Sequence, residues 1–182
     1  MEKINKNRAH LRRIVFDAML VALFVVFSTL LSFKTPWFEV SLVGLPILLC
    51  AYLYGWADAL LVAALGSFVE QLTSQYGLSP TTPIWMAPVM LLALVASLGF
   101  FLTKKSGGAL WAILLTVIVA ELVLTCANTA ALYLDGYIWQ YPVKALHLLL
   151  PTRLINGGVR TVISCVLVPL LLPPLRQKLP PR

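Results

Sequence analysis

Apolar residues fall in long runs that are separated by short polar or proline-containing breaks. The runs are Ile14 to Phe33, Ser41 to Tyr54, Asp58 to Thr73, Pro83 to Thr103, Ala109 to Leu134 and Thr152 to Leu175. A hydrocarbon core of roughly 30 Å needs about 20 helical residues. A backbone in lipid must also satisfy its own hydrogen bonds, so helices are the expected form. The pattern predicts an all-α, polytopic membrane protein with six transmembrane helices.

Composition supports a membrane protein. Of the 182 residues, 60% are apolar and 12% are charged, against roughly 45–50% and 25% in soluble domains. A soluble domain of this length has too little interior to bury so much apolar surface. The same figures exclude intrinsic disorder and a secreted disulfide scaffold. The chain is long enough for one compact unit.

The placement of basic residues predicts the orientation. The net charge is +7, and ten of the 14 Lys and Arg flank the apolar runs on one side: Lys3, Lys6, Arg8, Arg12, Arg13, Lys104, Lys105, Arg176, Lys178 and Arg182. Loops that are rich in Lys and Arg stay in the cytoplasm. Because the basic residues flank the apolar runs, the positive net charge indicates a protein in a lipid bilayer rather than one that binds nucleic acid. We therefore expect both termini to be cytoplasmic, with a basic N-terminal segment at 1–13, a six-helix domain at 14–175 in the cell membrane, and a basic tail at 176–182.

Three ionisable residues lie deep inside the predicted spans. Counted from the cytoplasmic end, Glu70, Glu121 and Arg160 lie at depths of about 20, 18 and 22 Å, so they could meet in one layer. Charges inside a bilayer are costly unless they are paired or hydrated. We expect Glu121 and Arg160 to form a structural ion pair; the alternative is that one or both contact a ligand. Glu70 is followed by several polar residues, so ligand contact and loop anchoring remain equally open for it.

Polar and aromatic residues gather at the extracytoplasmic ends of the predicted spans. The segment Tyr76 to Trp85 combines prolines, hydroxyls and aromatics, which suits either a pocket lid or a stiff helix-entry turn with Thr82 as cap. Below them, Arg153, Asn156 and Arg160 follow one another at spacings that share a helix face. The predicted substrate-binding residues are Glu70, Tyr76, Trp85, Asn128, Tyr137, Trp139, Arg153 and Asn156.

The sequence lacks the short motifs that are typical of enzymes and metal sites. It contains no phosphate-binding loop, no metal-ligand spacing and no nucleophile elbow. The three cysteines, Cys50, Cys126 and Cys165, are far apart and lie inside apolar runs, as small hydrophobic side chains do. We expect no enzyme activity, no cofactor and no metal site, and any energy source must be another subunit.

The first span carries a small-residue motif. Ala18 and Ala22 in Ala18-Met19-Leu20-Val21-Ala22 lie one turn apart, which lets another helix approach closely. With about 180 residues, six spans, this A-x-x-x-A and an outer pocket, the chain resembles the substrate-binding S component of an energy-coupling factor (ECF) vitamin transporter. The resemblance implies capture of a vitamin outside, followed by association with a transmembrane T component and two cytoplasmic ATPases. It implies that Ala18 and Ala22 face the T component, and that the S component topples in the bilayer to deliver its ligand.

The vitamin is not determined by any motif. Trp85, Tyr137 and Trp139 suit a flat or large conjugated ligand by stacking. The predicted loop from Asp135 to Pro151 leaves room for a bulky one, so cobalamin comes first, followed by folate and then a pyrimidine- or pyridine-type vitamin. Two other functions remain open. One is a stand-alone ion-coupled carrier or channel that uses Glu70, Glu121 and Arg160, and the other is a non-transporting membrane assembly subunit.

Overall fold

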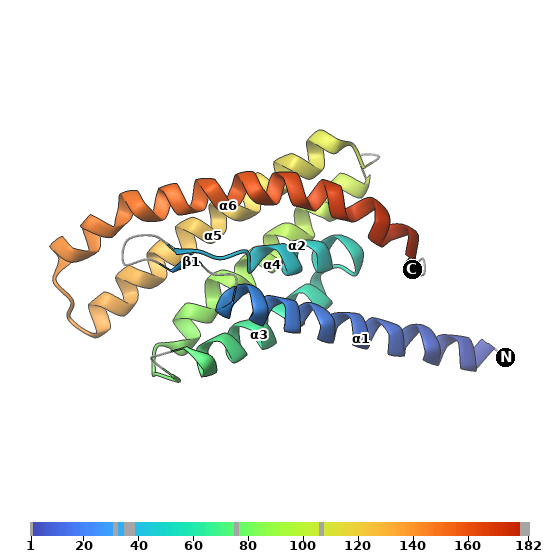
Figure 1. The fold of residues 1–182 in the computed structure, drawn as a ribbon, viewed down its shortest axis with the longest axis horizontal. Coiled ribbons are helices and arrows are strands. Elements are labelled where there is room, and N and C mark those ends of the chain that lie inside the picture. Colours follow the sequence, from blue (N-terminus) through green and yellow to red (C-terminus); the bar gives the residue numbers. More distant parts are fainter. Residues whose placement is uncertain (1, 31–32, 35–38, 75–76, 106–107, 179–182) are drawn as a thin grey trace.

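The computed structural model describes the whole chain except residues 1, 31–32, 35–38, 75–76, 106–107 and 179–182. Its elements are α1 (Glu2–Thr29), β1 (Phe33–Lys34), β2 (Glu39–Val40), α2 (Gly44–Leu53), α3 (Trp56–Thr73), α4 (Thr82–Lys105), α5 (Leu110–Ile138) and α6 (Val143–Lys178). Figure 1 shows the first turn of α1 and the last turns of α4 and α6 at the same end of the molecule, which we call the terminal end. The first turn of α4 and the last turn of α5 lie at the opposite, distal end.

The architecture is helical, as the hydropathy pattern predicts, and β1 and β2 form only a short antiparallel pair. Phe33 pairs with Val40 and Lys34 with Glu39. Each predicted apolar run contains most of a helix, but two boundaries differ. Helix α1 already begins at Glu2, so the basic segment 1–13 continues into the first helix.

The prediction of a long loop from Asp135 to Pro151 is wrong. Helix α5 continues to Ile138 and α6 begins at Val143, which leaves a connection of residues 139–142. Pro151 lies inside α6. A proline removes one backbone hydrogen bond, but helices that pack in a membrane tolerate it. Pro151 is therefore a residue of the helix and does not mark the end of a loop.

Three helices among the described residues are long and apolar enough to cross a membrane: α4, α5 and the His147–Leu175 part of α6. Helix α2 is also apolar but has only 10 residues, which rise by about 15 Å, half of a hydrocarbon core. It ends at Leu53, and Gly55, whose φ of 92° favours glycine, comes directly before α3. The second predicted span, Ser41 to Tyr54, is therefore a half-length helix that follows the extended residues of β2.

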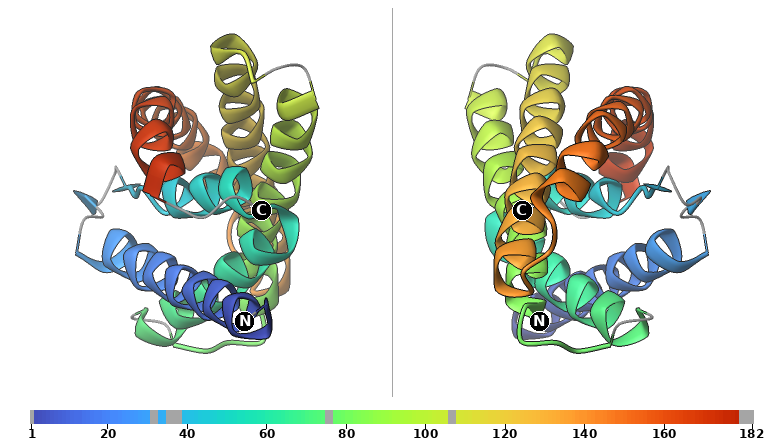
Figure 2. Two further views of the ribbon diagram at one scale, coloured as in Figure 1. Left: turned by 90° about the vertical axis from the view of Figure 1, so that its right-hand side faces the viewer. Right: turned by 90° about the vertical axis from the view of Figure 1, so that its left-hand side faces the viewer.

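Helix α2 forms the centre of the bundle. Every residue from Gly44 to Tyr52 is buried, and α2 packs against α1, α3, α4 and α6. Figure 2 shows α2 enclosed between α1 and α3 on one side and the pair α5 and α6 on the other. The largest buried side chains around it are Phe24, Phe100, Leu92 and Leu124.

The outer surface is apolar as well. Exposed side chains on α4 include Leu91, Leu94, Leu98, Phe101 and Leu102. Outward-facing residues that remain apolar are the expected surface of a protein whose solvent is lipid. Apolar residues therefore make up both the buried centre and the lipid-facing surface of the fold.

Candidate functional site

A buried ion pair joins α5 to α6. Arg160 Nε donates to Glu121 Oε2 at 2.6 Å, and the Glu121 side chain is completely buried. The other carboxylate oxygen of Glu121 accepts a hydrogen bond from Ser164 Oγ at 2.9 Å. Arg160 Nη2 donates to Thr125 Oγ1 at 3.0 Å. Each charged group is thus held by more than one bond, as a buried pair requires.

Two glycines let the helices approach this pair. A Cβ on Gly157 would lie 2.5 Å from Thr125 Oγ1, and one on Gly44 would lie 2.8 Å from Glu121 Oε1. The carboxylate therefore lies against the N-terminus of α2, where the helix dipole favours negative charge. The network connects α5 and α6 to the central helix, and it forms without Glu70.

Three predicted binding residues from three helices meet nearer the distal end. Arg153 Nη1 on α6 donates to the backbone carbonyl of Asn128 on α5 at 3.1 Å. The guanidinium carbon of Arg153 lies 6.0 Å from the centre of the Trp85 ring on α4, within the range of a cation–π contact. We call Trp85, Asn128, Arg153 and Asn156 the distal cluster. Asn128 takes part through its backbone, whereas the sequence suggested its side chain.

Asn156 is half-buried and lies about one turn along α6 from Arg153. Its Oδ1 atom is buried and has no hydrogen-bond partner within the described part of the chain. Leaving a buried acceptor unpaired costs roughly 1–3 kcal/mol, so such atoms in native structures need an explanation. A donor on a bound ligand would supply the missing bond.

The remaining predicted binding residues are Glu70, Tyr76, Tyr137 and Trp139. Tyr137 and Trp139 are 85% and 49% exposed. Glu70 is half-buried on α3, a helix that packs mainly on α1, α2 and α4. Tyr76 lies outside the described residues.

Comparisons with known proteins identify the family. The sequence model of the substrate-specific component of ECF transporters matches residues 12–172. The chain belongs to this family. A solved structure described as the S component of a bacterial ECF transporter matches with a TM-score of 0.67 and 19% identity, over 92% of this chain and 99% of that one. No curated protein sequence matches.

Family and fold settle the general activity of this S component. It is a membrane-embedded, substrate-specific subunit of a transporter and not an enzyme. Ala18 and Ala22, the small residues of its first helix, are both exposed on α1. Since they are one turn apart, they lie on the same face of that helix. The two small residues therefore lie together on an exposed face of α1.

One polar cluster of the S component was missed by sequence reasoning. Near the terminal end, Arg13 on α1 contacts Asp58 on α3 through Nε and Nη2, at 2.6 and 2.5 Å. Asp17 is 7% exposed, and Cys50 Sγ lies 3.7 Å from its Oδ1. The signal was available, because an aspartate inside the first apolar run is an ionisable residue in a span.

His147 also has a partner that its isolated position in the sequence did not suggest. Tyr133 Oη lies 3.1 Å from His147 Nδ1, and the two rings meet edge to face with centroids 5.9 Å apart. The contact joins α5 to α6 on the distal side of the Arg153–Asn128 bond. It stabilises the short connection between these two helices.

Proposed function

We propose that this S component captures a vitamin at the extracytoplasmic face and delivers it inward together with a T component and two cytoplasmic ATPases. The distal cluster is the observation that carries the proposal. It combines an aromatic ring, a cation and a buried acceptor that has no hydrogen-bond partner among the described residues, which is the composition of a pocket for a small polar ligand. Glu70 near the end of α3, and Tyr137 and Trp139 at the end of α5, complete the proposed set together with Tyr76, which lies outside the described residues.

The orientation is part of the proposal. Lys104 and Lys105 belong to the last turn of α4, and Arg12 and Arg13 belong to the N-terminal half of α1. The last turn of α4 and the first turn of α1 lie at the terminal end, which we assign to the cytoplasmic side of the cell membrane. Six crossings, the second made by α2 with the extended residues before it, place both termini on that side. The distal cluster then lies toward the outside.

Chemistry at the distal cluster restricts the ligand. Arg153 suits an acceptor or an anionic group, Trp85 suits a flat ring, and Asn156 Oδ1 suits an N–H or O–H donor. A conjugated heterocycle has all three features. Cobalamin, folate and pyrimidine- or pyridine-type vitamins are the candidates, and the short connection at 139–142 removes the argument from loop length that placed cobalamin first.

Energy for transport must come from the partners. We propose that the exposed face with Ala18 and Ala22 docks on the T component, because small residues allow close helix packing in a membrane. Glu121 and Arg160 act in this proposal as a structural pair that holds α5 against α6. The bound vitamin travels with the S component as it topples in the bilayer.

The experiment uses the purified full chain, alone and with the T component and ATPases in liposomes. Binding of each candidate vitamin is measured by calorimetry, and uptake is measured with and without ATP. Submicromolar to micromolar binding by the chain alone, with uptake only in the complete complex, is expected. Ion flux from the chain alone would instead identify a carrier or channel, and absence of binding to the whole panel would leave an assembly subunit.

A further inference from the structure

The last turn of α5 contains a buried carboxylate that belongs to none of the sites described so far. Asp135 is 8% exposed, and its buried Oδ1 atom accepts no hydrogen bond from the described residues. It follows Asn128 by seven residues, and Asn128 follows Glu121 by seven. Residues at this spacing share one face of a helix. Asp135 therefore extends the polar face of α5 toward the distal end.

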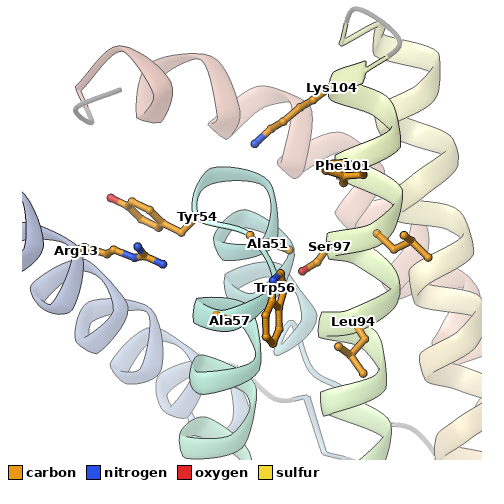
Figure 3. Close-up of a pocket in the computed structure, with 11 residues that line it drawn as sticks. Arg13, Ala51, Tyr54, Trp56, Ala57, Leu94, Ser97, Phe101 and Lys104 are labelled. Carbon is orange, nitrogen blue, oxygen red and sulfur yellow. The ribbon is translucent and has the colours of Figure 1, made fainter. Parts of the chain in front are cut away.

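The other three buried carboxylates in the described part of the chain all have donors. The pairs are Glu121 with Arg160, Asp17 with Cys50 and Asp58 with Arg13. Figure 3 shows Arg13 directed from α1 toward the turn between α2 and α3, at a pocket of about 530 Å³ near the terminal end. Burying a charge without a partner is costly in a membrane, so Asp135 needs an explanation.

Helix α6 supplies a cation to the first two levels of the polar face of α5. Arg160 pairs with Glu121, and Arg153 donates to the carbonyl of Asn128. The two arginines are seven residues apart, as their partners are. The next position of this series on α6 is Leu146, and leucine has no polar side-chain atom. The third level thus has a carboxylate on α5 and no arginine on α6.

Local backbone groups do not replace the missing donor. The last turn of α5 contains no basic residue, and the carbonyl end of a helix disfavours a nearby negative charge. At the start of α4, which lies at the same end of the molecule (Figure 1), the polar groups bond to one another. Ser79 N donates to Thr82 Oγ1. Trp85 N donates to the carbonyl of Thr81.

Helix packing places Asp135 close to the level of Trp85. Helices α4 and α5 run in opposite directions (Figure 1), and Thr116 on α5 lies against both Gly99 and Thr103 on α4. Equal steps along the two helices from these contacts bring Trp85 level with the turn that precedes Asp135. The difference in helix rise is at most about 8 Å. A flat ring stacked on Trp85 would therefore present an edge toward the level of Asp135.

We propose that Asp135 binds an amino group on the ring of the transported vitamin, so that the substrate is an amino-substituted, flat heterocycle. This inference rests on the proposed function and restricts its ligand. Acidic side chains accept hydrogen bonds from ring amino groups, as they do from that of cytosine. Aminopyrimidine and aminopteridine rings have such an edge. A pyridine ring that carries only carboxyl or hydroxyl groups does not.

The test is calorimetry of the purified full chain in detergent with two pairs of probes, thiamine with oxythiamine and pterin with lumazine. Within each pair an oxo group replaces the ring amino group. In at least one pair the amino compound should bind at least tenfold more tightly. Asp135→Asn should reduce this ratio to less than twofold, because an amide accepts from the amino group and also donates to the oxo group.

Thermal unfolding of the ligand-free chain separates recognition from a structural role. Asp135→Asn removes a charge that has no partner among the described residues, so the melting temperature should stay the same or rise. Glu121→Gln is the matched control. It makes the same chemical change on the same helix face at a carboxylate that is paired, and it should lower the melting temperature. An equal fall in both variants would overturn the proposal.

Binding by the wild-type chain decides the proposal even where a variant does not fold. Equal affinity for the amino and oxo compounds of both pairs, or an amino preference that persists in Asp135→Asn, would overturn it. A vitamin that binds tightly while neither pair shows a preference would contradict this inference and leave the proposed function intact. Absence of binding by every candidate vitamin would contradict the proposed function itself.

Discussion

The ion pair between Glu121 and Arg160 gives the sharpest test of how this bundle is held together. Replacing either residue by Met leaves the other charge in an apolar interior. Removing one partner of a buried pair costs about 3–5 kcal/mol, and the Glu121 variant also deprives Ser164 of its acceptor. Each single variant should therefore lose about 3–5 kcal/mol of unfolding free energy.

The double variant Glu121→Met, Arg160→Met should be much less destabilised than the sum of the two single variants. It leaves no buried charge, and two apolar side chains of similar volume refill the site. The lost bonds to Ser164 and Thr125 cost about 1 kcal/mol each. The coupling energy of the cycle should thus be at least about 4 kcal/mol, above the usual range of about 0.5–3 kcal/mol for contacting residues.

The assay is denaturant unfolding of the purified protein in detergent micelles, followed by circular dichroism. Val162→Met is the control, because this side chain is 65% exposed on the same helix, and it should shift the free energy by less than about 0.5 kcal/mol. If the two single effects simply added in the double variant, Glu121 and Arg160 would not stabilise each other, and the assignment of a structural pair would be refuted.

Three further outcomes are expected. Ala18→Trp with Ala22→Trp should abolish ATP-driven uptake in liposomes while vitamin affinity measured by calorimetry stays within about twofold, since two large side chains prevent close helix packing; a parallel loss of binding would contradict the docking role. Trp85→Ala should weaken vitamin binding by about 1–2 kcal/mol through lost stacking and cation–π contact, and an unaltered dissociation constant would place the ligand elsewhere. Gly157→Ala should lower thermal stability because its Cβ would lie 2.5 Å from Thr125 Oγ1, whereas Gly158→Ala, with no atom within 4 Å of its Cβ, should not; equal melting temperatures would show that α5 and α6 can separate without cost.

Several features of the distal cluster and of the buried ion pair could be predicted from the sequence because they depend on local spacing. Arg153, Asn156 and Arg160 repeat at three and four residues, which places them on one face of a helix in any fold. That Arg153 meets Trp85 on another helix, and that Asn128 contributes its carbonyl, depends on which helices are neighbours. The spacing of Ala18 and Ala22 likewise predicts that they share one helix face. That this face is exposed depends on how α1 packs in the bundle.

The hydropathy of the chain by itself determined a membrane protein made of helices, because the cost of leaving backbone groups unpaired in lipid acts on every apolar run separately. Only the tertiary structure decided that α2 is a half-length helix buried at the centre, and that Pro151 lies within α6. Only it decided the partners of the buried charges: Arg13 and Asp58 are 45 residues apart, and Glu121 and Arg160 are 39 apart. A charged residue in a membrane span indicates that a partner is needed, because burying the charge alone is costly. The identity of that partner follows from helix packing, which a single sequence does not encode locally.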